Sequence, residues 1–556
     1  MLITFVIWIV AFIFSIIAGI LIQSFGINKH NDSFLFIFLL GFCFLVVYSQ
    51  IYSLFLPIKS CASLGILLLI YLIIFLINKK NIKYIVKNIF TKNTFKPKEI
   101  ICIVLVSLIS LFYILLMTSQ KSADFDDYLY HCQAVRWIEE LGTVKGSGLI
   151  NSRVSFNSSL FAVYALFGFR DIFGETTHTI IGFVAFISLL GLLIEVFRKK
   201  KKYALCILGL DIYYIICVRT SLNTLGSDVI PNLLICCIAE LWLNEDNTYL
   251  RADLCMLVFI AITMKLSFAV LGIIAIFPII ELLKNKKYKQ ILFYFICGLV
   301  VTLPYLIRNY FISGWLLYPL TAIDIFNVEW KVPTKWAQEQ ADWVYAWARR
   351  GMTDGIEAAN FAFSEWFPLW WKWFAYRNIK IILISSASLS VLWFIYLIIK
   401  LIKKKNINFP FLSLVISFIC ENLYWLITAP AVRFSFIPIY LLPILLAISI
   451  PFIDKLISAV LKKELVYIIG ICLMMCYFML RFTIDDCEYL FIKPETFMEM
   501  DADEYKMSEN ITLYTPSGKY DWAVGADYFP GGEYIENIMQ IEPIGKTIKE
   551  GFRIKK

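Results

Sequence analysis

Long apolar runs recur along this chain and are separated by short polar segments. A helix needs about 20 mostly apolar residues to cross the hydrocarbon core of a bilayer. On that criterion the runs predict about fourteen membrane-spanning helices, at 2–22, 34–55, 58–77, 100–118, 176–197, 203–219, 228–243, 253–264, 267–283, 290–310, 379–401, 408–428, 434–453 and 465–482. The expected fold is therefore an all-α polytopic membrane protein.

Two apolar stretches do not fit the simple pattern of one run for each span. Residues 254–283 form one long apolar stretch, which we expect to turn back on itself in a short hairpin at Lys265. Ser158–Phe169 is too short to cross a bilayer, so we expect an interfacial helix that lies on the outer leaflet.

The basic residues of the polar segments predict the orientation. They form five clusters, at Lys79–Lys98, Arg198–Lys202, Lys284–Lys289, Lys403–Lys405 and Lys455–Lys463. Each cluster follows an odd-numbered span, so all five lie on one side, and short lysine-rich loops are typical of the cytoplasmic side. The localisation expected is a bacterial cytoplasmic (inner) membrane, crossed many times. The N-terminus, the loops 119–175 and 311–378, and the tail 483–556 then face outward.

Composition agrees with this class and excludes others. The 556 residues are 60% hydrophobic and 17% aromatic, more than a soluble domain of this size needs. The net charge of +9 lies in loops between apolar runs, so we expect no nucleic-acid partner. With only three histidines, a His-based metal site is not expected. Most of the fourteen cysteines lie in apolar runs; Cys132 and Cys487 do not, and they could pair, although this is not the default expectation.

An acidic segment follows the fourth span. Asp124, Asp126 and Asp127 lie within four positions, and an amphipathic helical pattern then ends at Gly142. The simplest interpretation is helix capping, with Asp126 as N-cap and Asp127 in the first turn. One cap needs one acid and this segment has three, so we favour a functional site. His131 is interpreted as a residue of the helix surface.

The other outer segments add aromatic and basic residues. The loop 311–378 contains nine tryptophans, which either stack on sugar rings or form an aromatic belt at the interface. Lys265, Arg308 and Arg433 each lie at the outer end of a span, where they either hold a lipid phosphate or snorkel to the interface. The tail contains strand and turn signals, which predict a small β-containing cap on the outer face.

Four segments in this order resemble the GT-C superfamily of glycosyltransferases, and a bacterial integral membrane branch of it most closely. They are Asp126-Asp127 with Tyr130, Ala134, Ile138 and Gly142; TMKLS around Lys265; RNYFISGWLLYPL at Arg308–Leu320; and PAVRFSF at Pro430–Phe436. The chain departs from the superfamily pattern in having three spans before the acidic loop and no proline directly after Ser313-Gly314-Trp315. The resemblance implies a GT-C-like core at 100–482, extra N-terminal spans at 1–99 and the cap at 483–556.

The resemblance also implies a reaction. GT-C enzymes move a sugar from a polyprenyl-phosphate donor to a glycan or lipid acceptor on the outer face of the membrane, here with inversion. Asp126 is then the expected base, with Asp127 and Asp124 as further catalytic carboxylates. Lys265, Arg308 and Arg433 are expected to bind the donor phosphate.

The remaining expectations concern the sugar, the metal and the partners. Tyr130, Trp315 and Tyr318 are expected to contact the acceptor or the sugar. No cofactor is certain, no metal ligand is assigned, and members of the superfamily differ in their need for Mg or Mn. The expected partners are a polyprenyl-phosphate-linked sugar, the acceptor and membrane lipid.

Three other function classes remain open. A transporter or flippase of lipid-linked sugars would more often place ionisable residues in the middle of the membrane. A Wzy-like glycan polymerase would have basic residues in two outer loops rather than an acidic pair after an early span. A receptor or scaffold without chemistry predicts no convergence of acids and cations on one face.

Overall fold

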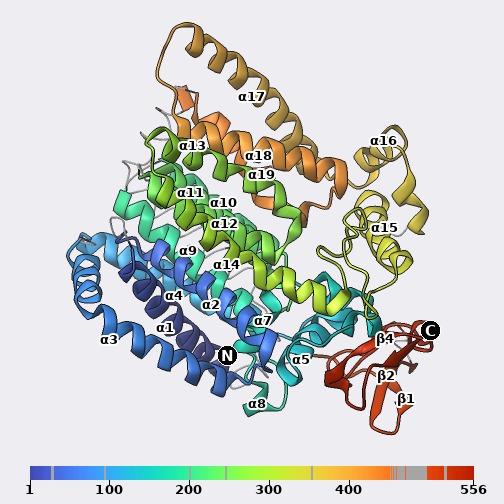
Figure 1. The fold of residues 1–556 in the computed structure, drawn as a ribbon. Coiled ribbons are helices and arrows are strands. Elements are labelled where there is room, and N and C mark those ends of the chain that lie inside the picture. Colours follow the sequence, from blue (N-terminus) through green and yellow to red (C-terminus); the bar gives the residue numbers. More distant parts are fainter. Residues whose placement is uncertain are drawn as a thin grey trace.

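A computed structural model shows a largely helical chain with a small β region near its C-terminus (Figure 1). The structure describes residues 1–26, 31–92, 95–199, 202–244, 247–351, 355–450, 497–518 and 522–555, together with Phe452, Ile453, Lys455, Ala459, Gly470 and Tyr477. The expected span at 465–482 lies outside the described residues, apart from two isolated positions, and so does Cys487.

Every other expected span contains a helix. These helices are α1 Leu2–Ser24, α2 Phe34–Phe55, α3 Ser60–Lys92, α4 Pro97–Ser119, α9 Ile180–Lys199, α10 Lys202–Cys217, α11 Val229–Asn244, α12 Thr248–Met264, η4 Leu266–Ala275 with α13 Ile276–Lys284, α14 Tyr288–Ser313, α17 Arg377–Ile402, α18 Phe409–Thr428 and α19 Phe436–Ile448. Within the described part of the chain, nine helices are long and apolar enough to cross a membrane. The chain is thus a multi-pass membrane protein.

Local signals explain where several of these helices begin and end. Ser33 caps α2 by accepting from the Phe36 amide, and Asn408 caps α18 by accepting from the Phe411 amide. Pro97 opens α4 and Gly314, at φ 75°, ends α14. The helix α3 bends at Asn78, where its apolar half gives way to a lysine-rich half.

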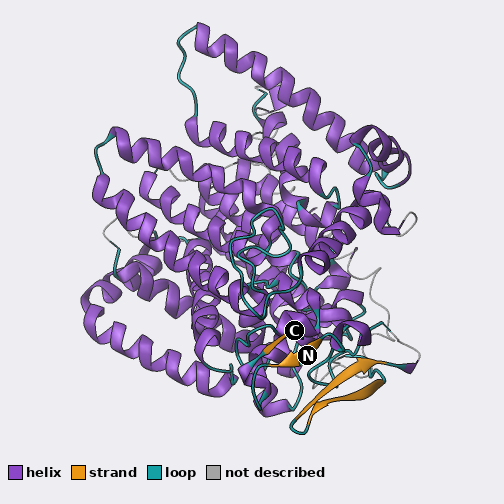
Figure 2. Cartoon of the chain, turned by 45° about the vertical axis from the view of Figure 1, so that its right-hand side comes forward, coloured by secondary structure: helices purple, strands orange, loops and turns teal. Residues whose placement is uncertain are grey.

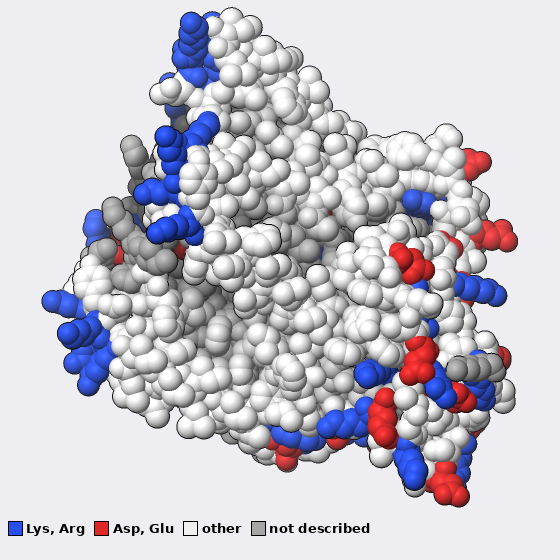
Figure 3. Space-filling model, in the orientation of Figure 1, with Lys and Arg blue, Asp and Glu red and all other residues white. Residues whose placement is uncertain are grey.

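The outward-facing surfaces are those expected of a protein in lipid. Large apolar side chains of α3, α14 and α17 are exposed, among them Ile77 at 70%, Phe295 at 63% and Ile384 at 56%. The helices form the bulk of the molecule and the strands lie at one end of it (Figure 2). Lys and Arg gather along one edge, over the ends of α3, α13 and α17, whereas the opposite edge carries both signs of charge (Figure 3).

The two unusual apolar stretches have different outcomes. The hairpin is confirmed: α12 ends at Met264, Lys265 is extended, and the chain returns through η4 and α13, which both pack against α12. The interfacial helix is wrong, because α7 (Leu160–Leu166) is buried inside the protein, with no side chain more than 2% exposed, and packs against α2. A short apolar helix can be surrounded by protein as well as by a leaflet.

The polar segments contain short helices that build the face opposite to the basic edge. They are η1 Asp127–His131, α5 Cys132–Glu140, α6 Ser147–Ile150, η2 Ser152–Phe156, α8 Arg170–Phe173, η3 Arg219–Ser221, α15 Thr334–Arg350, η5 Gly355–Asn360, α16 Phe363–Trp373 and η6 Val432–Phe434. The helix α5 ends where expected, since Gly142 follows it at φ 80°, a conformation that favours glycine, and a Cβ there would press on the backbone of Ser53 and Leu56.

The tail forms the expected β-containing cap. It consists of β1 Ala502–Ser508, β2 Ile511–Pro516, α22 Ile535–Ile538, β3 Ile541–Pro543, η9 Ile548–Glu550 and β4 Phe552–Ile554. The strands β1 and β2 pair antiparallel, with Ala502 opposite Pro516, and β3 and β4 pair antiparallel, with Ile541 opposite Ile554. The expected division of the chain at 99 and 482 stays a prediction, because one continuous hydrophobic core joins residues of all three parts.

The cap is held to the acidic segment through α5. The buried Gln133 donates to the carbonyls of Gly525 and Tyr528 and accepts from the Gly531 amide. Arg136 donates to the carbonyls of Ala526 and Asp527. Five polar contacts therefore fix the position of the tail against the helix that follows the acidic segment.

Candidate functional site

The three aspartates of the acidic segment have three different environments. Asp124 accepts a hydrogen bond from the backbone amide of Asp126 at 3.0 Å, as a residue that starts a helix does. The side chain of Asp126, by contrast, makes no capping hydrogen bond. The capping interpretation therefore applies to Asp124, and it leaves the Asp126 carboxylate available for another role.

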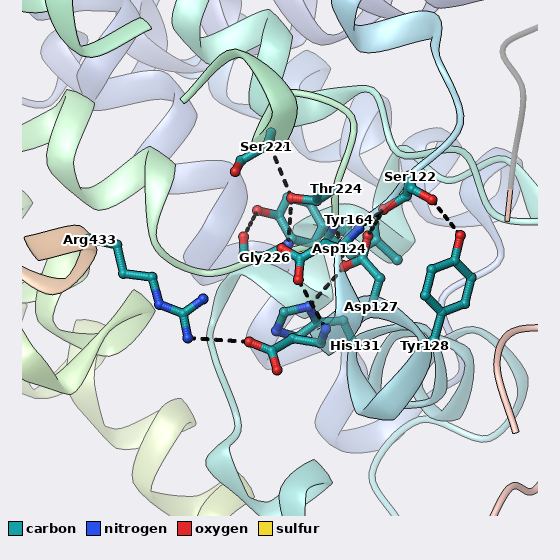
Figure 4. A network of polar contacts seen from close by, with 12 residues as sticks. Ser122, Asp124, Asp127, Tyr128, His131, Tyr164, Ser221, Thr224, Gly226 and Arg433 are labelled. Atoms are coloured by element: carbon teal, nitrogen blue, oxygen red, sulfur yellow. Dashed lines mark hydrogen bonds and ion pairs between the residues drawn. The ribbon is translucent and has the colours of Figure 1, made fainter. Parts of the chain in front are cut away.

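Asp127 is the centre of a buried network (Figure 4). It is 0% exposed; one carboxylate oxygen accepts from the Ser122 hydroxyl at 2.5 Å, and the other from His131 Nδ1 at 2.9 Å and from the Leu225 amide at 3.0 Å. The wide π-helical turn η1 presents Asp127 and His131 to one another. The hydrogen bond from the Leu225 amide joins the loop after α10 to the acidic segment. Because both of its oxygens already accept hydrogen bonds, Asp127 has a structural role.

His131 corrects a sequence interpretation. We expected it on the helix surface, but it is 3% exposed, with its ring 4.2 Å from that of Tyr130 and 5.6 Å from that of Phe161. Burial lowers the pKa of His131, but the hydrogen bond and charge of Asp127 outweigh burial, so the pKa lies above its ordinary value. The imidazole is a structural partner of Asp127.

Asp126 faces a cation from another part of the chain, Arg433, which Asp228 also contacts. Arg433 Nη2 lies 3.5 Å from Asp126 Oδ2, and Arg433 Nε lies 3.4 Å from Asp228 Oδ2. Lys265 forms an ion pair with the same Asp228. The side chains of Asp126 and Arg433 are 28% and 42% exposed, so a ligand can reach both.

Aromatic rings hold these cations in place. The Arg433 guanidinium lies 4.5 Å from the ring centre of Trp347 in α15, and Lys265 Nζ lies 4.4 Å from that of Phe434. Such cation–π contacts each stabilise the observed position by about 0.5–2 kcal/mol. The outer-loop helix α15, the hairpin at Lys265 and η6 thus meet at the acidic segment.

The surroundings of the charged groups also shift their pKa values. Burial, followed by the charge of Asp127, raises the pKa of Asp124 to about 6. Burial lowers the pKa of Arg433, but the charges of Asp228 and Asp126 outweigh burial and raise it above its usual value. The site therefore holds a permanent cation between two carboxylates, next to a third carboxyl group that titrates near neutrality.

Arg308 is not brought to this group. It is 3% exposed, and its Nη1 donates to the Ser53 hydroxyl at 3.0 Å. In the part of the chain that the structure describes, no recorded contact joins Arg308 to Asp126 or Asp228. Of the three expected phosphate-binding cations, two are therefore together and the third lies inside the helix bundle.

The three aromatic residues expected at the acceptor also divide. Tyr130 lies at the site, with its ring 5.8 Å from that of Phe156 and 6.4 Å from that of Phe161. Trp315 and Tyr318 are each 1% exposed. The Trp315 indole donates to the Val332 carbonyl, and the ring of Tyr318 packs 5.8 Å from Phe156. Of the three residues, only Tyr130 is partly exposed, and a ligand can contact only an exposed side chain.

Asp228 is the site residue that sequence reasoning missed. It lies directly before α11, at the outer end of a span by the same alternation that placed Asp126 outside. Its position on the same side of the membrane as Asp126 was the signal from which Asp228 could have been predicted. As for metals, no group of three or more His, Cys, Asp or Glu side chains suited to holding an ion occurs within the described ranges.

The arrangement can bind an anion next to a proton acceptor. Arg433 can present two N–H groups to a phosphate and Lys265 adds a point charge. Asp126 lies beside them with a partly exposed carboxylate that can accept a proton from a hydroxyl group. These are the groups that a displacement at a phosphate-activated carbon needs.

The comparisons with known proteins place most of the chain in one family. Residues 1–440 match the family model described as "Domain of unknown function (DUF8201)". The match includes Asp126, Asp228, Lys265 and Arg433, and it ends before the cap. No curated protein and no solved structure matches the chain.

Proposed function

Because this chain belongs to the DUF8201 family, whose description assigns no activity, we propose a function from the site itself. The protein is a membrane glycosyltransferase of the inverting GT-C type. It moves a sugar from a polyprenyl-phosphate donor to a glycan or lipid acceptor on the outer face of the bacterial inner membrane. The observation that carries the proposal is the partly exposed Asp126, which caps no helix and faces Arg433 beside Lys265.

The reaction uses each of these groups once. The acceptor hydroxyl oxygen attacks the anomeric carbon of the sugar and loses its proton to Asp126. The bond from that carbon to the phosphate oxygen breaks, and its electron pair leaves with the polyprenyl phosphate. Arg433 and Lys265 stabilise the negative charge that grows on the departing phosphate. Asp228 holds both cations in position.

The distribution of charge supports the orientation that this reaction needs. The lysine-rich ends of α3, α13 and α17 lie on one edge, which the positive-inside rule assigns to the cytoplasm (Figure 3). The acidic segment, α15 and the cap lie toward the opposite edge (Figure 1). Both termini are then outside, on the side where lipid-linked sugars are used.

A lipid-linked-sugar transporter is the second candidate, and one observation favours it. Glu195, Asp211, Glu240 and Glu421 are each 0% exposed within helices. Buried carboxylates in spans are typical of ion-coupled transport. Each carboxylate contacts a polar side chain, as Asp211 does with Ser188 and Glu421 with Ser435, which suits a structural role equally well. A Wzy-like polymerase would share the outer cations but would not need Asp126 as base.

The test is sugar transfer by the purified protein from a polyprenyl-phosphate sugar, with Asp126→Asn as the variant. Asn keeps the size of the side chain and removes the proton acceptor, so the rate should fall by about a hundredfold to ten-thousandfold at unchanged thermal stability. Asp342→Asn, which changes an exposed carboxylate of α15 that accepts from Gln338, is the matched control and should transfer normally.

The other outcomes point elsewhere. Normal transfer by Asp126→Asn would reject it as the base. Movement of the lipid-linked sugar across vesicles without formation of a glycosidic bond would favour the transporter. Repeating the assay with EDTA tests whether Mg or Mn is needed as a further source of positive charge.

A further inference from the structure

A cavity lies between the outer-loop helix α15 and the cap. Its volume is about 180 Å³, and its lining includes Trp336, Gln340 and Trp343 of α15 and Glu533, Tyr534 and Asn537 of the tail. Two indole rings and a phenol thus share one small space with amide and carboxylate groups. Binding sites for small polar molecules commonly combine flat apolar faces with a few well-placed hydrogen-bonding groups.

The cavity is connected to the candidate site by one face of α15. Trp336, Gln340, Trp343 and Trp347 follow one another at intervals of four, three and four positions, which places them in one stripe along the helix. Trp347 lies under the Arg433 guanidinium. With a rise of 1.5 Å for each residue, Trp343 is about 6 Å along the axis from Trp347. The stripe therefore leads from the cavity to the cation beside Asp126.

The back wall of the cavity is tied to the acidic segment as well. Glu533 is 4% exposed and accepts from the backbone amide and hydroxyl of Ser152 and from the Arg153 guanidinium. Ser152 and Arg153 begin η2, and Phe156 ends it with its ring against Tyr130. The wall is thus built from polar groups that bond one another, and η2, to which two of them belong, extends to the site.

We propose that this cavity binds a sugar unit of a growing glycan acceptor, one or more units away from the hydroxyl group that reacts at Asp126. Trp336 and Trp343 offer faces for a sugar ring, and Gln340 and Asn537 offer amides for its hydroxyl groups. This rests on the proposed function, and it identifies the acceptor as a polymer rather than a lipid.

The charge of the lining restricts the class of glycan. Glu339, Glu533 and Glu536 line the cavity with one cation, Arg153, which already pairs with Glu533. The surplus of carboxylates repels anionic chains and suits hydroxyl or ammonium groups. The acceptor is therefore an uncharged or amino-bearing glycan and not a polyanion.

The test measures binding without turnover. Purified Asp126→Asn protein is applied to an array of bacterial envelope glycans that contains neutral, amino-bearing and anionic members. We expect binding to neutral or amino-bearing glycans, and a loss of about tenfold in affinity when Trp343→Ala is added, because that variant removes an indole face on which a sugar ring packs. Trp373→Ala, which removes an indole of α16 that is 66% exposed, is the control and should bind normally.

The outcomes separate this inference from the proposed function. Absence of binding, preference for anionic glycans, or equal binding by Trp343→Ala would overturn the cavity as an acceptor site, whatever the transfer assay shows. Transfer that depends on Asp126 together with glycan binding that ignores Trp343 would keep the proposed function and reject the inference. Binding that depends on Trp343, in a protein whose natural sequence shows no transfer activity, would keep the cavity as a glycan site and reject the proposed function.

Discussion

At the scale of single residues, three neighbouring aspartates have separate tasks. Asp124 accepts from the backbone, Asp127 is held by Ser122, His131 and Leu225, and Asp126 faces Arg433. The sequence predicted that three acids exceed the need for one cap, but it assigned the cap to Asp126. Composition and spacing could not settle the assignment, because one partner of Asp127, the Leu225 amide, comes from a loop about a hundred positions away.

Arg433 should matter for donor use and Arg308 should not. Arg433→Ala should weaken use of the polyprenyl-phosphate donor by about 1–3 kcal/mol, since a charge-assisted hydrogen bond is lost, and Arg433→Lys should restore only part of it. The measurement is kcat/KM for the donor. Arg308→Met, the comparison variant, should lower thermal stability with little change in KM for the donor, because Arg308 bonds only Ser53 among the described residues. Equal losses of donor use in both variants would contradict this division.

Asp124 should impose a pH dependence on transfer. Burial and the charge of Asp127 raise its pKa to about 6, so its charge appears as the pH rises through 6. That negative charge lies next to the proposed base, Asp126, so the rate of transfer should increase between about pH 5 and 7. Asp124→Asn should lack this step.

The same shift has a consequence for folding. The pKa in the folded state exceeds the unfolded value of about 4, so the folded state binds the proton more tightly. Stability should therefore fall as the pH rises from about 4 to 6, and Asp124→Asn should reduce this slope. A step near pH 6 that survives in the variant would assign the titration to another group.

At the scale of elements, the acidic segment departs from the regular helix that its spacing predicted. The faces at three- and four-residue intervals describe α5 well, but the first turn, η1, is a π-helix. Hydrophobic periodicity cannot predict a single π-helical turn, because that turn depends on the buried contacts of Asp127 and His131. Likewise, α7 has the length of an interfacial helix, and only the neighbours around it show that it is internal.

The docking of the cap on α5 should depend on Gln133. Gln133→Leu would leave the Gly531 amide and the carbonyls of Gly525 and Tyr528 without their partner, at about 1–3 kcal/mol for each buried group. We expect a lower thermal unfolding temperature and faster proteolysis of the tail. Gln338→Leu, at an exposed position of α15, is the matched control. A tail that stays equally protected in Gln133→Leu would show that other contacts hold the cap.

At the scale of the whole molecule, hydropathy predicted where the helices lie in the sequence. The fold of the loops between them determines which residues meet at the candidate site. The longer spans could be predicted from runs of about 20 apolar residues, because the thickness of the bilayer imposes that length. The shorter helices, such as α10 and α11, were predicted from shorter apolar runs. The sequence predicted only part of the candidate site, because four loops far apart in the sequence meet there. They contribute Asp126, Asp228, Lys265 and Arg433. The shared outer side could be inferred; which of Arg308 and Arg433 reaches Asp126 could not.

Orientation gives the test at this scale. Tags inserted after Lys286 and after Lys404, in the basic turns that follow α13 and α17, should be accessible only from the cytoplasm. Tags after Asn327 and at the C-terminus should be accessible from outside intact cells. A C-terminal tag that reports the cytoplasm would contradict both the topology and the proposed location of the site.

The sharing of one guanidinium by Asp126 and Asp228 sets an order in time. A donor phosphate that binds Arg433 competes with both carboxylates for the same N–H groups. Under the proposed function, the phosphate must displace Asp126 and Asp228 from Arg433 before it can be held there, and the same event frees the Asp126 carboxylate from its ion pair. The proposal therefore predicts ordered binding, with the donor first and the acceptor second.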